Sequence, residues 1–204
     1  MTKIKICGLK STKDISYVNQ LNPDYIGFVF LQGRQRSVSF KDAAALRSLL
    51  KPEIQSVGVF VNEPLENVLS LLETGTIQLV QLHGRENTSY ALKLKSLCRK
   101  PIIKAFIIKG KEDIKRALDY PCDYLLLDNG LGTGEAFDWS LIQGIHKPFF
   151  LAGGLNPANV KDAIKRTHPY AVDVSSGVET NCRKDYQKIK AFIEACHAAD
   201  HIRS

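Results

Sequence analysis

The feature that most constrains the fold is a regular alternation of strand patterns and helix patterns along the chain. Short runs rich in β-branched and aromatic residues recur, and each is followed by a segment with helical periodicity. The runs lie near Ile4, Tyr25, Ser56, Ile77, Ile102, Tyr124, Phe149 and Ala171. Strands that alternate with helices predict a parallel sheet, and nearly continuous apolar runs predict strands that are buried on both faces.

Eight such units in 204 residues predict an α/β protein, a single (β/α)8 barrel of the TIM type at the small end of its size range. The structural alternative is an open doubly wound sheet, which needs a topological switch point and usually has fewer strands. Neither a linker nor a low-complexity tract interrupts the rhythm, so we expect one domain over residues 1–204.

Local signals predict where individual helices begin. Ser11 stands three residues before Asp14, which is the spacing of a capping box. Asn156 and Pro157 offer a cap and a first-turn proline for a later helix. We therefore expect helices to begin directly after Ser11 and at Pro157.

Composition argues against several classes of protein. The five cysteines are widely spaced and form no Cys-x-x-Cys pair, so we expect free thiols rather than disulfides or a zinc site. The longest apolar runs are far shorter than the roughly 20 residues that span a bilayer. Because the chain enters a strand pattern at once, without a signal-peptide pattern, we expect a cytoplasmic protein with no membrane partner.

The formal net charge of +7 suits an anionic partner. The lysines are scattered over helix faces among acidic residues, and no basic and aromatic stripe accompanies them. We therefore expect no nucleic-acid partner and favour a small anionic metabolite.

Glycines gather after the last three predicted strands. They lie in 130–134, at Gly153 and Gly154, and after Ser175 and Ser176. Glycine lets backbone N–H groups converge on an anion, and barrels of this type commonly hold phosphate there. Each cluster alone could simply make a tight turn, but three on adjacent strand ends predict a phosphate site.

Two side chains at strand ends are candidate acid–base groups. Cys7 ends the first strand and shares its strand face with Lys5, whose charge would favour the thiolate; Asp173 is the expected structural partner of that lysine. Asp128 ends an apolar strand, where desolvation would raise its pKa and let it act as a general acid. The alternatives are a cysteine that only packs and an aspartate that only caps a turn.

Two further side chains are candidate binding residues. Arg36, in the loop after the second strand, could grip a carboxylate in bidentate fashion or simply be solvated. His83 is the one histidine at a strand end, which leaves no second histidine for a metal site, and a pair at His197 and His201 falls on a terminal helix turn. We predict neither a metal nor a cofactor.

Taken in order, six motifs give the chain a resemblance to the phosphoribosylanthranilate isomerase family over essentially its whole length. They are Lys5-Ile6-Cys7-Gly8, Gln81-Leu82-His83-Gly84, Leu125-Leu126-Leu127-Asp128, Gly132-Thr133-Gly134 with Phe137-Asp138-Trp139, Leu151-Ala152-Gly153-Gly154-Leu155, and Asp173-Val174-Ser175-Ser176-Gly177-Val178-Glu179. The chain departs from the family pattern at Arg34-Gln35, where relatives often have Ser-Pro, and at Leu131 and Glu135.

The resemblance implies an Amadori rearrangement in tryptophan biosynthesis that needs no cofactor. It implies Asp128 as the acid that opens the ribose ring, Cys7 as the base at C2′, and Arg36 as the group that holds the anthranilate carboxylate. His83 is a further substrate-binding candidate, and the implied phosphate-binding residues are Gly132, Thr133, Gly134, Gly153, Gly154, Ser175 and Ser176. The expected assembly is a monomer or a homodimer.

Three other functions remain as alternatives. A histidine-pathway barrel performs an analogous rearrangement, with chemistry that uses carboxylates at the ends of the first and fifth strands. At those two positions this chain has Cys7 and Ala105-Phe106. A metal-dependent pentose-phosphate epimerase would need a histidine pair. An inactive barrel that binds a phosphometabolite would be distinguished by its lack of turnover.

Overall fold

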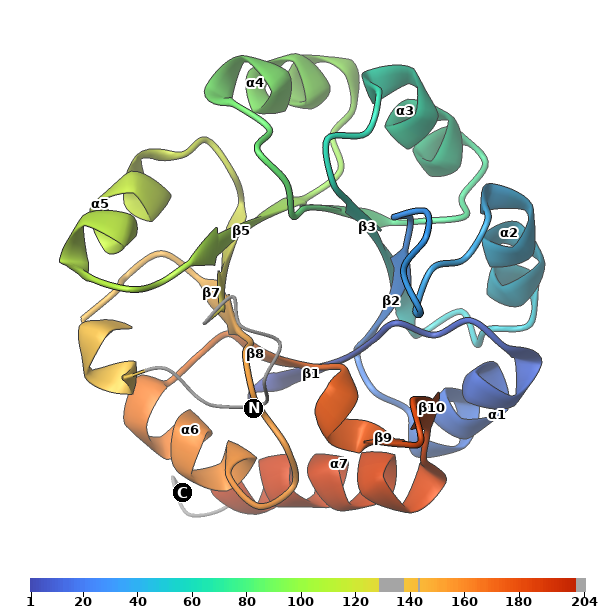
Figure 1. The fold of residues 1–204 in the computed structure, drawn as a ribbon, viewed down its shortest axis with the longest axis vertical. Helices are drawn as coiled ribbons and strands as arrows, with labels where there is room; N and C mark the ends of the chain where they lie inside the picture. Colours follow the sequence, from blue (N-terminus) through green and yellow to red (C-terminus); the bar gives the residue numbers. More distant parts are fainter. Residues whose placement is uncertain (129–137, 143, 201–204) are drawn as a thin grey trace.

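Eight parallel strands close into a barrel in the order in which they occur along the chain (Figure 1). The computed structural model describes residues 1–128, 138–142 and 144–200. The strands are β1 (Lys3–Cys7), β2 (Tyr25–Val29), β3 (Gln55–Phe60), β4 (Leu79–Leu82), β5 (Ile102–Ile107), β6 (Tyr124–Asp128), β7 (Phe149–Leu151) and β8 (Ala171–Val174). Pairing of β1 with β8 closes the ring, so the predicted barrel is confirmed and the open sheet is excluded.

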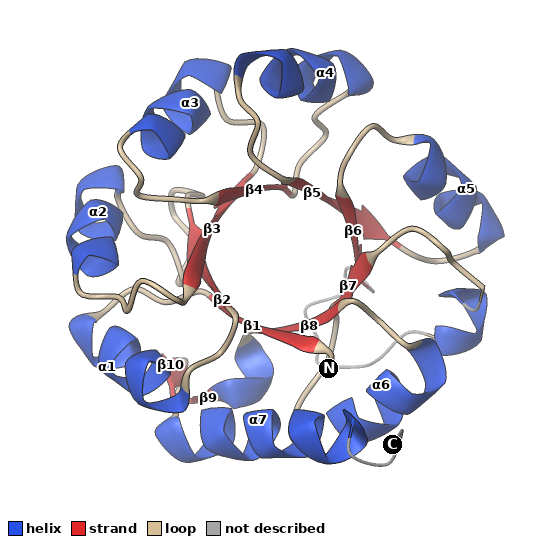
Figure 2. Cartoon of the chain, turned by 180° about the vertical axis from the view of Figure 1, so that it is seen from behind, coloured by secondary structure: helices blue, strands red, loops and turns tan. Residues whose placement is uncertain are grey.

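Helices form a ring around the barrel (Figure 2). They are α1 (Thr12–Leu21), α2 (Phe40–Ser48), α3 (Leu65–Glu73), α4 (Thr88–Leu97), α5 (Lys111–Asp119), α6 (Val160–Thr167) and α7 (Tyr186–Asp200). A short 3-10 helix, η2 (Ser176–Val178), and a two-stranded hairpin, β9 (Glu179–Thr180) with β10 (Arg183–Lys184), connect β8 to α7. This hairpin is an addition to the predicted elements, and it carries two residues of the site described below.

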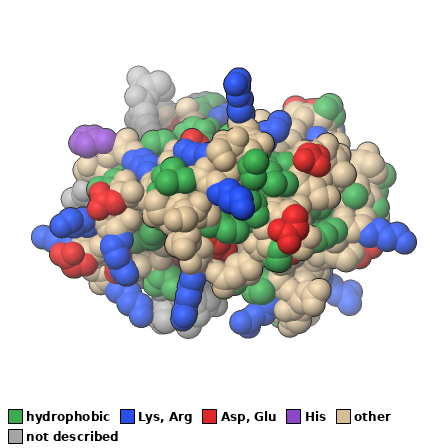
Figure 3. All heavy atoms as spheres, turned by 90° about the horizontal axis from the view of Figure 1, so that it is seen from above, with side chains coloured by type: hydrophobic (Ala, Val, Ile, Leu, Met, Phe, Trp, Pro, Cys, Tyr) green, Lys and Arg blue, Asp and Glu red, His purple; other side chains and the backbone are tan. Residues whose placement is uncertain are grey.

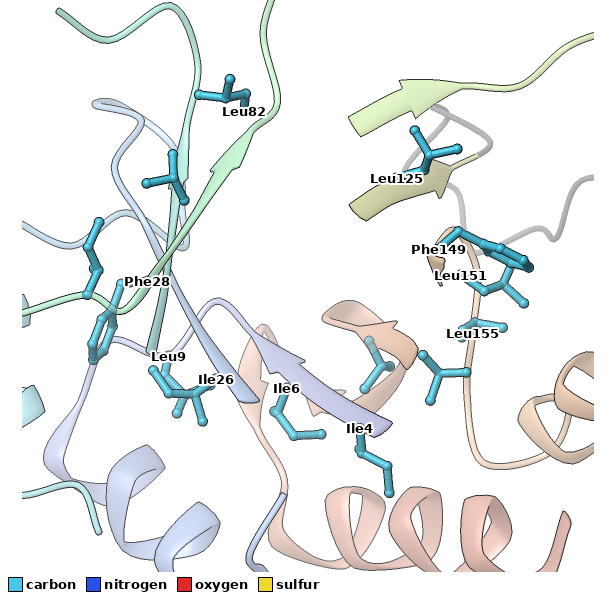
Figure 4. Packing of buried hydrophobic residues seen from close by; sticks show 14 of the residues in the cluster. Ile4, Ile6, Leu9, Ile26, Phe28, Leu82, Leu125, Phe149, Leu151 and Leu155 are labelled. Atoms are coloured by element: carbon cyan, nitrogen blue, oxygen red, sulfur yellow. The ribbon is translucent and has the colours of Figure 1, made fainter. Parts of the chain in front are cut away.

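The core has two layers because side chains alternate along each strand. Outward-facing residues such as Ile4 and Ile6 pack against the helices, as Figure 4 shows. Inward-facing residues fill the barrel and form its floor; they are Tyr25, Val57, Leu79, Ile103, Leu126, Phe150, Ala152 and Ala171. The barrel interior is therefore solid below the site, which confines ligands to the ends of the strands.

The helix-start predictions are partly confirmed. Ser11 caps α1, accepting a hydrogen bond from the Asp14 backbone N–H while the Asp14 side chain caps in return. The prediction at Pro157 is wrong by one turn, because Asn156 accepts from the backbone N–H groups of Ala158 and Asn159 and holds a turn there, so α6 begins at Val160.

Within residues 138–142 and 144–148, the connection from β6 to β7 contains no α-helix of the kind predicted. Its described part contains a single turn of 3-10 helix, η1 (Trp139–Ile142). Residues 145–148 then run straight into β7 through Pro148, which cannot continue a helix.

Charges of both signs mix on the surface, as Figure 3 shows for one face. Lysine and arginine side chains there stand among aspartate and glutamate rather than in a single patch. None of the described helices is long and apolar enough to cross a bilayer.

Candidate active site

A pocket of about 1140 Å³ opens at the carboxyl ends of the barrel strands. It brings together most of the predicted site residues, namely Cys7, Arg36, His83, Asp128, Gly153, Gly154, Ser175 and Ser176. The predicted phosphate residues Gly132, Thr133 and Gly134 lie outside the described residues. A second hollow, of about 740 Å³, lies on the outer surface beside α1 and carries no comparable set of chemical groups.

Cys7 lines this pocket, and the glycine opposite it on the neighbouring strand leaves room for its side chain. It pairs with Gly27 across β1 and β2, and its side chain is buried, with 8% of the residue exposed. A Cβ at Gly27 would lie 2.6 Å from Cys7 Sγ, so the thiol occupies the space that any other residue would fill. Gly27 therefore belongs to the site although sequence reasoning did not single it out; a glycine inside a strand pattern was the available signal.

Gly27→Ala is expected to lower kcat by about tenfold or more, because the added methyl group displaces Sγ and misplaced reacting groups lose rate steeply. Steady-state kinetics measures the effect. Gly110→Ala is the matched control, since a Cβ there meets nothing within 4 Å. Unchanged kcat in folded Gly27→Ala would contradict this account of how the thiol is placed.

The ion pair predicted below Cys7 is present. Lys5 Nζ lies 2.9 Å from Asp173 Oδ2, and the lysine is fully buried. Burial raises the pKa of the Cys7 thiol above its ordinary value, although Lys5 and Lys184 both act to lower that pKa. The prediction that a cation favours the thiolate is therefore correct in direction, but the effect of burial on the thiol pKa is larger.

Asp128 stands at the end of β6, facing the pocket beside His83. His83 is accessible in the pocket, and its Nδ1 lies 2.9 Å from Nε2 of the buried Gln81. Desolvation lowers the pKa of His83, while the charge of Asp128 acts to raise it. A lowered pKa favours the neutral imidazole near pH 7. If Nδ1 accepts from the Gln81 amide, Nε2 is left to donate toward a ligand.

The loops after β7 and β8 contact each other at the rim of the pocket. Gly153 and Gly154 both have positive φ, +83° and +66°, a conformation that favours glycine. A Cβ at Gly177 would lie 1.9 Å from the Leu155 carbonyl oxygen, so glycine is required for the two loops to touch. Ser175 Oγ donates to the Cys7 carbonyl oxygen at 3.1 Å. These loops suit an anion, and they lie next to the thiol.

The surroundings of Arg36 differ from the prediction. Its guanidinium pairs with a carboxylate of the protein itself: Nε and Nη2 donate to Oε1 and Oε2 of Glu179, each at 2.8 Å. Lys184 Nζ donates to the same Glu179 at 2.7 Å. Sequence reasoning missed both partners, although Glu179 ends one of the quoted motifs.

Among the described residues, histidine, cysteine, aspartate and glutamate side chains form no group of three that could hold a metal ion. The carboxyl group of Asp128, the thiol of Cys7, the imidazole of His83 and the glycine loops line one pocket, an arrangement that suits proton transfer on an anionic ligand.

A family model described as N-(5'phosphoribosyl)anthranilate (PRA) isomerase matches residues 4–195. The chain belongs to this family. Among curated relatives, the N-(5'-phosphoribosyl)anthranilate isomerase of Endomicrobium trichonymphae is 50% identical over 194 residues, covering 93% of this chain and 95% of the relative. That of Thermoanaerobacter sp. (strain X514) is 44% identical over 201 residues, covering 95% and 97%.

Solved structures of phosphoribosylanthranilate isomerases share the fold closely. The Thermotoga maritima enzyme superposes with a TM-score of 0.90 at 38% identity, covering 97% of this chain and 100% of its own. A family structure in complex with reduced 1-(o-carboxyphenylamino)-1-deoxyribulose 5-phosphate gives a TM-score of 0.88 at 38% identity, with the same coverage.

Proposed function

We propose that the chain converts N-(5-phosphoribosyl)anthranilate to 1-(2-carboxyphenylamino)-1-deoxyribulose 5-phosphate, a step of tryptophan biosynthesis, by general acid–base catalysis. The single observation that carries the proposal is that Cys7 and Asp128 line one pocket, together with the glycine loops after β7 and β8. The family membership and the product analogue bound by a relative support the same reaction.

In the proposed reaction Asp128 protonates the ribose ring oxygen, the ring C–O bond breaks, and the nitrogen lone pair forms an iminium at C1′. Cys7, as thiolate, then removes the proton at C2′, and the electron pair of that C–H bond gives the enolamine. Transfer of the enol proton to C1′ yields the ketone. No net oxidation occurs, so the residues alone can carry the chemistry without a cofactor.

Two sets of donors in the pocket suit the two anionic ends of the substrate. Backbone donors of Gly153 and Gly154, with Ser175 and Ser176, are the proposed phosphate ligands, together with Gly132, Thr133 and Gly134. Arg36 is proposed to bind the anthranilate carboxylate. His83, as a neutral donor, is proposed to bind the sugar.

We further propose one catalytic domain over residues 1–204 that acts in the cytoplasm without a nucleic-acid or membrane partner. The Thermotoga maritima isomerase is dimeric, and a solved structure shows monomers generated from it. For this chain, monomer and homodimer both remain proposed states, which light scattering of the purified protein separates.

The test is the decay of substrate fluorescence when freshly made phosphoribosylanthranilate is mixed with the protein. Rapid, protein-dependent decay with stoichiometric formation of the ketone supports the proposal. A folded protein that leaves the substrate unchanged, yet binds the reduced product analogue, would instead indicate an inactive phosphometabolite-binding barrel.

A further inference from the structure

The ion pair between Arg36 and Glu179 uses a particular edge of the guanidinium. Glu179 accepts from Nε and Nη2. A guanidinium has five N–H groups, so the edge formed by Nη1 and the second N–H of Nη2 is left for another acceptor pair. Arg36 lines the pocket and its side chain is 34% exposed, whereas the Glu179 side chain lies behind it at 7%.

Glu179 is itself firmly fixed. It begins β9, where it pairs with Lys184 of β10, and Lys184 Nζ donates to its Oε1 at 2.7 Å. Lys188 Nζ donates to its backbone oxygen at 2.7 Å. Burial would raise the pKa of Glu179, but the hydrogen bond from Arg36 and the charge of Lys184 lower it overall, so the carboxylate stays ionised.

The same network reaches the proposed base. Lys184 Nζ donates to the Ser175 backbone oxygen at 2.9 Å, and Ser175 Oγ donates to the Cys7 carbonyl oxygen. The stem of Arg36 crosses Gly8, where a Cβ would lie 2.8 Å from Arg36 Cδ. Gly8 therefore leaves room for the aliphatic part of the Arg36 side chain, and Glu179 holds its guanidinium. Together they fix the position of the guanidinium relative to the Cys7 thiol.

We propose that Glu179 is a positioning residue that holds Arg36 by its Nε and Nη2 and so presents the Nη1/Nη2 edge to the carboxylate of an aryl-carboxylate substrate. Glu179 does not contact the substrate; it acts through Arg36. The inference rests on the proposed function, because that function supplies the carboxylate.

A double-mutant cycle tests this inference. The dissociation constant of reduced 1-(o-carboxyphenylamino)-1-deoxyribulose 5-phosphate is measured by calorimetry for wild type, Glu179→Gln, Arg36→Met and the double variant. Glu179→Gln is expected to weaken binding about tenfold, since a charge-assisted hydrogen-bond pair is lost. In the Arg36→Met background it is expected to change binding by less than about twofold. Kinetically, KM rises while kcat changes by less than about threefold.

Asp24→Asn is the control, since that carboxylate pairs with Lys3 at the opposite end of the barrel, and it should leave binding unchanged. Equal weakening by Glu179→Gln in both backgrounds, or none in wild type, overturns the inference. A wild type that neither binds the analogue nor turns over substrate overturns the proposed function instead. If Glu179→Gln does not fold, Glu179→Asp keeps a charge beside Lys184 while withdrawing the carboxylate by one methylene, and the same cycle applies.

Discussion

Cys7→Ser is expected to lower kcat by about 10² or more, the usual contribution of a general base. A serine hydroxyl fits the space beside Gly27 but ionises far less readily than a thiol, so it cannot remove the C2′ proton. Binding of the reduced product analogue should change little, because the proposed phosphate-binding loops and Arg36 are unchanged. Together, kcat and the affinity for the analogue distinguish the loss of the base from damage to the binding site.

The pH profile gives this prediction a second readout. Because burial raises the pKa of Cys7, little thiolate is present at pH 7, and kcat/KM should climb with pH by up to about tenfold per unit until the thiol is ionised. Cys7→Ser should abolish this rise. Cys98→Ser, which alters a partly exposed thiol at the end of α4, is the matched control and should keep it. A Cys7→Ser enzyme with wild-type kcat would exclude Cys7 as the base.

The sequence predicts the barrel and the shared face of Lys5 and Cys7 because both follow from short-range periodicity. Alternation along β1 places Lys5 and Cys7 on one face, and parallel closure with β8 brings Asp173 beside Lys5. The sign of the pKa shift at Cys7 could not be predicted in the same way. It depends on how completely the surrounding loops remove water, which is a property of the packed structure.

The hairpin that carries Glu179 and Lys184 escaped prediction for a local reason. Two-residue hairpin turns are usually recognised by Asn-Gly, because both central residues need positive φ. Here Asn181 and Cys182 take that conformation, with φ of 49° and 60°, and a cysteine gives no such signal. The contact of Arg36 with Glu179 therefore could not be predicted, although Arg36 itself was predicted as a site residue.

Asp128→Asn is expected to lower kcat by about 10² or more, because an amide is far too weak an acid to protonate the ribose ring oxygen. The substitution preserves shape, so the product analogue should still bind. Asp123→Asn is the matched control: that carboxylate lies just before the other end of β6, where it pairs with Lys95. Kinetics of both variants beside wild type decides whether the acid is at the pocket end of the strand.

Asp128→Asn should also change the pKa of His83, and this change can be measured without turnover. The charge of Asp128 raises the pKa of His83, while desolvation lowers it. Removing that charge should therefore lower the pKa of His83 further, which an NMR titration of the imidazole measures. A loss of kcat together with this shift places the lost acid beside His83 in the pocket. A loss of kcat with an unchanged His83 titration would mean that the damage lies elsewhere and that Asp128 does not face the histidine as the acid must.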